Sequence, residues 1–179
     1  DKLMAKRLDN AVYVACEERA RYYAERIART ESARAWFDGF LAKHGQDPDV
    51  IGYRWTLGSR HPRFDVCDFH AHVDFYGMGS GVYPKDSLPP LPAHPHCLCS
   101  LLPVYAGETL QGKKFDPQAG ESYLNKAPLA SRQALLGVKG EESWRLGWEG
   151  WTELAQRRGW QEHVNPLGRL KATDFSLRQ

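Results

Sequence analysis

The sequence predicts an α+β fold with a long N-terminal helix, a small antiparallel sheet with a zinc-stapled loop, and C-terminal helices. Three observations predict it. Residues 3–44 carry an uninterrupted helical pattern, residues 50–57 and 98–105 have the composition of strands, and cysteine and histidine cluster between those strands. With 179 residues, the chain is long enough for one domain, or for one domain with appendages.

The first 44 residues contain no proline, and their first glycine is Gly39. Apolar side chains recur there at steps of three and four: Leu8, Val12, Cys16, Ala20, Tyr23 and Ile27. This spacing lines one face of a helix, so we expect one long helix or two abutting ones. The apolar stripe is expected to pack against the rest of the chain or against a partner helix, with Cys16 as a small buried residue in it.

A turn at residues 45–48 ends this helix and leads into residues 50–57, which are rich in the β-branched and aromatic side chains of a strand. Residues 98–105 predict the return strand, in which Pro103 restricts the later part to a sheet edge or a bulge. Between the two strands, residues 77–95 are rich in glycine and proline and predict a loop. A loop of this length is unusual in a compact domain unless it is functional or held by a staple.

Beyond the return strand, residues 106–126 give no clear prediction. Pro128 opens an expected short helix at residues 129–136. Residues 141–158 predict another helix, on one face of which three side chains form an expected packing surface: Trp144, Trp148 and Trp151. We therefore expect a domain over residues 1–105 and a mainly helical extension over residues 106–179 that packs on it.

The candidate metal ligands are Cys67, His70, Cys97 and Cys99. A C-x2-H pair and a C-x-C pair supply four soft or borderline ligands, which suits tetrahedral zinc. Four protein ligands leave no position for a substrate, so the predicted site is structural. Unligated core cysteines and a disulfide are the alternatives, although Cys97 and Cys99 are too close together to form an easy disulfide with each other.

The ligand set has alternates among the neighbouring histidines. His94 or His96 could take the place of Cys99, and His72 could take the place of His70. We favour Cys67 with His70, because a two-residue spacing commonly brings two ligands to one metal. Asp65 and Asp68 are candidates to orient a ligating histidine through a hydrogen bond.

Composition and motifs argue against several other functions. The net charge of +2 is too small to indicate a nucleic acid or a membrane as partner, and no apolar run approaches the roughly 18 residues of a membrane span. A phosphate-binding loop, a nucleophile elbow and an H-E-x-x-H helix are all missing from the sequence. We expect a protein that is not an enzyme and has no small-molecule substrate. A zinc-containing nuclease or toxin, with a clustered histidine as general base, is the alternative.

An ordered set of motifs runs from about residue 20 to residue 105. It comprises Arg29-Thr30-Glu31 on the long helix, Trp55 in an aromatic strand, Arg63-Phe64-Asp65-Val66-Cys67, Pro89-Pro90, and His94-Pro95-His96-Cys97-Leu98-Cys99. The set resembles the phage Mu F-like minor head proteins, also called head morphogenesis proteins. One departure is visible, because His70 stands where the family has the second cysteine of C-x-x-C.

The resemblance implies a minor structural protein of a tailed phage or prophage, made in the host bacterial cytoplasm and then incorporated into the virion, in the head interior or the portal region. It implies portal or coat proteins as partners, with the long helix as their contact surface; DNA is a weaker candidate. Within this frame, Arg29 and Glu31 are expected either to form an ion pair that locks the helix against the zinc loop or to be exposed charges. Arg63 is expected to reach a carboxylate such as Asp65, or a partner.

Overall fold

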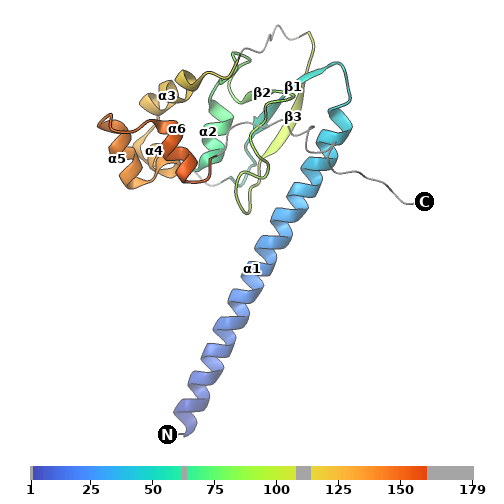
Figure 1. Ribbon diagram of the computed structural model, residues 1–179. Helices are drawn as coiled ribbons and strands as arrows, with labels where there is room; N and C mark the ends of the chain where they lie inside the picture. The colour runs from blue at the N-terminus through green and yellow to red at the C-terminus, as the bar shows by residue number, and fades with distance from the viewer. Residues whose placement is uncertain (1, 62–63, 108–113, 161–179) are drawn as a thin grey trace, which may run out of the picture.

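The computed structural model describes residues 2–61, 64–107 and 114–160. It confirms the predicted α+β fold, with a long N-terminal helix, a three-stranded antiparallel sheet and helices toward the C-terminus (Figure 1). Helix α2 lies between the sheet and the C-terminal helices, since it contacts both β1 and α4. Arg63 and the tail after residue 160 lie outside the described residues.

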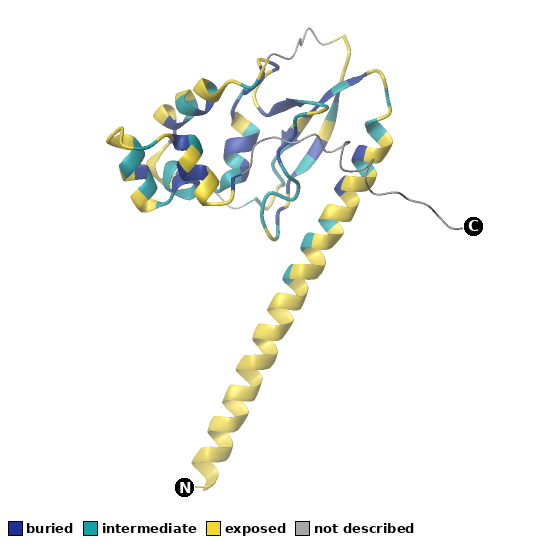
Figure 2. Ribbon diagram, viewed as in Figure 1, coloured by how far each residue is buried: buried dark blue, intermediate teal, exposed yellow. Residues whose placement is uncertain are grey.

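Helix α1 (Lys2–His44) is one continuous helix that projects away from the domain (Figure 1). Only its C-terminal part is covered, where Phe37 and Leu41 are buried (Figure 2). The expected apolar stripe does not pack on the described part of this chain, because Leu8, Val12 and Ile27 are 65%, 55% and 63% exposed. Cys16 is likewise exposed, so the expectation that it is buried was wrong.

The sheet has the strand order β2-β1-β3, with β1 (Val50–Thr56) in the centre and antiparallel to both neighbours. Strand β3 (Ser100–Tyr105) is an edge strand, which is where Pro103 predicted it to be. Strand β2 (Val82–Pro84) lies inside the segment predicted as loop, because three residues are too few to show a period. Gly52 of β1 packs so closely on the carbonyl of Tyr83 that a side chain there would clash with the neighbouring backbone.

Helix α2 (Val66–His72) was not predicted, since its seven residues are too short for a helical period. Its start is specified by a capping box. Asp65 accepts a hydrogen bond from the N–H of Cys67 at 2.7 Å, and Asp68 accepts one from the N–H of Asp65 at 2.8 Å. The two carboxylates predicted to orient a ligand therefore also build the helix that positions Cys67.

The C-terminal part contains α3 (Pro117–Lys126), α4 (Leu129–Leu136), α5 (Val138–Arg145) and α6 (Trp151–Arg157). Helix α4 is as predicted, and α3, capped by Asp116, was missed. The single helix predicted over residues 141–158 was wrong, because the chain breaks between α5 and α6, where Gly147 has a φ of 72°. The three tryptophans consequently do not share one face: Trp151 is buried, and Trp148 is 74% exposed.

One cluster of buried residues joins the sheet to the C-terminal helices. On α2, Phe69 meets Trp151 of α6 edge to face, with ring centroids 5.3 Å apart, and it meets Phe75 at 5.5 Å. Such aromatic contacts add to the stability that comes from burying the rings. The two sides of residue 105 thus contribute to the same core, and the domain division at that residue stays a prediction.

Candidate metal centre

Three segments bring sulfur and imidazole together beside the start of α2. Cys67 lies in the first turn of α2, and its thiol is fully buried. His94, Cys97 and Cys99 come from the loop before β3, and His61 comes from the segment after β1. These residues form two overlapping groups that could each hold a metal ion, and the groups share Cys67. One group is Cys67, His94 and Cys97, and the other is His61, Cys67 and Cys99.

The distances within the cluster suit a tetrahedral metal. The sulfurs of Cys67 and Cys97 are 3.7 Å apart, and Nε2 of His94 is 3.2 Å from the Cys67 sulfur. Two thiolates on one tetrahedral zinc lie about 3.8 Å from each other, because each Zn–S bond is about 2.3 Å long. In each group of three, the ligand atoms lie within 4.8 Å of one another.

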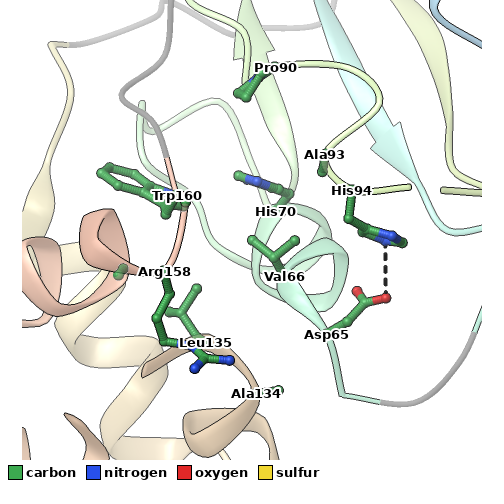
Figure 3. A pocket seen from close by; sticks show the side chains of 12 residues that line it. Asp65, Val66, His70, Pro90, Ala93, His94, Ala134, Leu135, Arg158 and Trp160 are labelled. Atoms are coloured by element: carbon green, nitrogen blue, oxygen red, sulfur yellow. Dashed lines mark ion pairs between the residues drawn. The ribbon is translucent and has the colours of Figure 1, made fainter. Parts of the chain in front are cut away.

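His70 belongs to neither group, although the sequence predicts it as the partner of Cys67. Its buried ring packs on Trp55 with centroids 4.9 Å apart, and Figure 3 shows it pointing away from His94 and Asp65. A two-residue spacing brings two ligands together in a turn, but here the same residues form the regular helix α2. His70 therefore lies one helical turn beyond Cys67, against the sheet.

Among the alternates, only His94 is brought to the described cluster. His72 is tied through Nδ1 to the carbonyl of Asp68 at 2.7 Å, and the ring of His96 lies 6.1 Å from that of Tyr22 on α1. His61 was not predicted as a ligand. The only signal for it is its position six residues before Cys67, on the segment that leads into α2.

His61 is deeply buried, with 7% of its side chain exposed. Its Nε2 lies 3.0 Å from Oδ2 of Asp68 and 3.5 Å from Oδ1 of Asp65. Its Nδ1 is buried and has no hydrogen-bond partner among the residues that the structure describes. A buried polar atom without a hydrogen bond lowers the stability of the fold by about 1–3 kcal/mol. Nδ1 of His61 therefore either destabilises the fold or binds an atom such as a metal ion.

His94 is differently placed, with 27% of its side chain exposed. Its Nδ1 hydrogen bonds to the carbonyl of Pro95 at 2.9 Å, and its Nε2 pairs with Asp65 at 3.2 Å (Figure 3). The hydrogen bond to Asp65 is the main cause that raises the pKa of His94, to about 10. Burial alone would raise the pKa of Asp65, but the hydrogen bonds from His94 and from the Cys67 N–H outweigh it and lower that pKa.

The thiols affect one another's protonation. Hydrogen bonds with Cys97 and Cys99, together with burial, raise the pKa of Cys67. Hydrogen bonds from Cys67 and Cys99 lower the pKa of Cys97. Thiols packed this closely cannot all ionise without a counter-charge, and a metal cation supplies that charge when it deprotonates and binds them.

The predicted motif residues of α1 lie near this cluster. On α1, Thr30 hydrogen bonds to the carbonyl of Arg26, and Glu31 pairs with Arg34 at 3.1 Å on the exposed surface. In the part of the chain that the structure describes, Glu31 therefore pairs within its own helix and not with Arg29. Two grooves flank the contact between α1 and the loop before β3, which carries His94, Cys97 and Cys99. One is lined by residues that include Thr30, Glu31 and Pro95, and the other by residues that include Arg29, Cys97 and Leu98.

A pocket of about 240 Å³ borders the cluster on the side of the C-terminal helices (Figure 3). Asp65 and His94 lie on one wall, Arg158 and Trp160 lie on another, and Pro90 lies above them. Trp55 is buried in the sheet beneath the ring of His70 and does not line this pocket. The predicted motif residues therefore divide between the cluster, the α1 contact and the core.

Comparison of the chain with models of known families, with curated proteins and with solved structures gives no match in any of the three. The family resemblance therefore rests on the sequence motifs alone and stays a prediction. Among the described helices, none combines the length and the hydropathy that crossing a membrane requires.

Proposed function

We propose that this chain is a non-catalytic minor head protein of a tailed phage or prophage, with a structural zinc ion that fixes the loop before β3. One observation carries the zinc part of the proposal. Cys67 and Cys97 are 30 residues apart in the sequence, yet their sulfurs lie 3.7 Å apart in the buried cluster. That separation matches two thiolates on one zinc.

The donor set favours zinc over other metals. Thiolate and imidazole are the ligands of structural zinc sites, whereas magnesium and calcium prefer oxygen. The long segment between β2 and β3 has no helix or strand of its own in the structure. A metal bound at Cys67, Cys97 and Cys99 ties this segment to α2, which explains how an irregular stretch of that length is held in place.

The phage part of the proposal is supported by the ordered motifs and by where they lie. The Arg29-Thr30-Glu31 turn of α1 borders grooves beside the loop before β3. This motif and the motif that contains Cys97 are therefore neighbours, although they are far apart in the sequence. In this proposal, the protein is made in the bacterial cytoplasm and enters the virion. Portal or coat proteins are its partners, and DNA is a weaker candidate.

Helix α1 supplies the surface for those partners. Leu8, Val12 and Ile27 lie on the projecting helix and are more than half exposed. Single exposed apolar side chains are common, but apolar side chains that follow one face of a helix form a continuous stripe, which is typical of a surface that another protein covers. Co-expression with the portal protein of the same phage should give a complex that the double substitution L8D/V12D abolishes and that E18A, on the same exposed helix, leaves intact. Failure to associate with both portal and coat protein would contradict this assignment.

Elemental analysis tests the zinc site directly. Protein purified without chelator should contain about one zinc per chain, and Cys67→Ser should lose it because removing one thiolate opens the site. Cys16→Ser is the matched control, since Cys16 is an exposed cysteine on α1 and far from the cluster. A folded wild-type protein without bound metal would exclude the proposed zinc site, and only the sequence motifs would then support the function.

One observation favours a second candidate, a zinc-containing nuclease or toxin. The pocket beside the cluster places Asp65 and His94 within reach of a bound molecule and adds the cation of Arg158. Hydrolysis of DNA by the zinc-loaded protein, lost in His94→Ala with zinc retained, would favour this candidate over the non-catalytic one.

A further inference from the structure

Three cysteines and two histidines meet at the cluster, but a tetrahedral zinc takes four ligands. One of these five side chains is therefore surplus, and because zinc favours soft thiolate ligands, we take it to be one of the two histidines. The two histidines differ in the hydrogen-bond partners of their ring nitrogens. This difference indicates which of them binds the metal and which lies beside the site.

His94 has protein partners at both nitrogens. Its Nδ1 faces the carbonyl of Pro95 at 2.9 Å, and its Nε2 faces the carboxylate of Asp65 at 3.2 Å. Each of these acceptors calls for a proton on the facing nitrogen, whereas a nitrogen that binds a metal carries none. The partial exposure of the side chain, 27%, also leaves it open to water.

Within the described residues, His61 has a hydrogen-bond partner at one nitrogen only. Its Nε2 lies 3.0 Å from Oδ2 of Asp68, while Nδ1 is buried and has no hydrogen-bond partner in the described part of the chain. The ring contributes a ligand atom within 4.8 Å of the sulfurs of Cys67 and Cys99. A histidine that donates its other N–H to a carboxylate has the usual arrangement of a metal-bound imidazole, in which the carboxylate fixes the tautomer and the ring orientation.

We propose that Nδ1 of His61 is the fourth ligand of the metal, with the thiolates of Cys67, Cys97 and Cys99. Asp68 holds the ring through Nε2–H, and His94 stays outside the coordination sphere as a donor to the Cys67 sulfur, 3.2 Å from its Nε2. This assignment rests on the proposed zinc site and specifies its ligands.

Asp68 links His61 to helix α2, which carries the ligand Cys67. Its Oδ2 accepts hydrogen bonds from the backbone N–H of Asp65, at 2.8 Å, and from Nε2 of His61. The first bond belongs to the capping box that starts α2, and α2 carries Cys67. One carboxylate therefore sets the position of two ligands, so Asp68→Asn should weaken zinc binding by about 10- to 100-fold, as the loss of an outer partner typically does.

The test compares full-length protein carrying zinc or cobalt in four forms: wild type, H61A, H94A and H72A. His72 is the control, because it lies on α2 near Asp68 but belongs to neither group. We expect H61A to lose more than about 100-fold in zinc affinity, beyond the effect of an outer partner, and to change the cobalt d–d absorption. H94A and H72A should keep the wild-type spectrum. Nitrogen-15 NMR of the zinc form should show His61 with its proton on Nε2.

Other outcomes overturn the assignment. If H94A loses the wild-type cobalt spectrum and H61A keeps it, His94 is the ligand. If both variants keep the spectrum, neither histidine is a ligand. If H61A fails to fold, H61C should restore folding and strengthen the sulfur-to-cobalt charge-transfer band, because a fourth thiolate then replaces the imidazole; an unchanged band would contradict the proposal. A wild type that binds no metal overturns the proposed zinc site as well, whereas a zinc-loaded wild type with an unaffected H61A overturns the ligand assignment alone.

Discussion

Helix α1 has one apolar pattern along its length but two different environments. Near its C-terminal end, Phe37 and Leu41 are buried against the domain, whereas every residue from 2 to 25 is exposed (Figure 2). The exposed segment is about 36 Å long at 1.5 Å per residue. Spacing of apolar residues thus predicts the helix along its whole length, but it does not predict what covers the apolar face.

The domain draws its stability from tertiary contacts, while the exposed part of α1 depends on local ones. The core around Phe69, Phe75 and Trp151 joins segments that are far apart in sequence. In the projecting helix, contacts between neighbours on the helix predominate, such as the hydrogen bond from the Tyr13 hydroxyl to Glu17 at 2.6 Å, and the ring contact of Tyr22 with His96 is an exception. In proteins most of a helix's stability comes from the tertiary packing of its apolar face, and residues 2–25 are exposed. Perturbations should therefore separate the two regions cleanly.

Metal removal should give the largest effect and confine it to the domain. With free zinc at about 1,000 times its dissociation constant, the bound metal adds about 4 kcal/mol to the free energy of unfolding. A chelator should remove that contribution and lower the melting temperature, as measured by calorimetry. Amide exchange of residues 2–25 should not change, because none of them belongs to the metal cluster. A melting temperature that is the same with and without chelator would contradict the prediction.

A matched pair of leucines on α1 tests the two environments within one helix. Leu41→Ala should lower the free energy of unfolding by about 3 kcal/mol, since leucine truncation in a core costs about 2–5 kcal/mol. Leu8→Ala removes the same atoms from a side chain that is 65% exposed and should change it by less than about 0.5 kcal/mol. Urea unfolding of both variants measures the difference. Equal losses would mean that the N-terminal part of α1 is also packed in solution.

Two glycines repeat the comparison at the level of the backbone. Gly52→Ala should cost about 1–3 kcal/mol, because its new methyl group would collide with the backbone of Tyr83 in β2. Gly39→Ala lies in α1 with no atom near the new methyl group and should stabilise the protein by about 1 kcal/mol through helix propensity. Thermal unfolding should move in opposite directions for the two variants. A stabilising Gly52→Ala would show that β2 does not pack on β1 as described.

The elements that could be predicted from the sequence are those with long local patterns. Helix α1 and strands β1 and β3 show their period or composition over at least six residues. Helix α2 and strand β2 are too short for a period and are specified by contacts instead, α2 by the capping box of Asp65 and Asp68 and β2 by its pairing with β1. The break between α5 and α6 at Gly147 was missed because helical spacing continues across it.

The residues of the candidate site also fall into two classes, those that a local pattern predicts and those that tertiary structure brings in. Residue type and spacing single out Cys67, Cys97 and Cys99, because a C-x-C pair with a further cysteine and nearby histidines is a pattern typical of metal sites. Which histidine joins them depends on tertiary structure. His70 is turned onto Trp55 by the regular geometry of α2, while the segment after β1 brings His61 to the cluster. No local pattern contains that information.

The smallest expected effect concerns the exposed part of α1 alone. Glu17→Ala removes the hydrogen bond from Tyr13, an i,i+4 contact worth about 0.2–0.5 kcal/mol in an isolated helix. Because residues 2–25 have few other contacts, we expect faster amide exchange in that segment and an unchanged melting temperature for the domain. Glu31→Ala is the control, since it also removes a local contact on α1, the i,i+3 ion pair with Arg34, near the covered end of the helix. Its effect on exchange should be smaller, because the packing of Phe37 and Leu41 holds that end of the helix whether or not the pair forms.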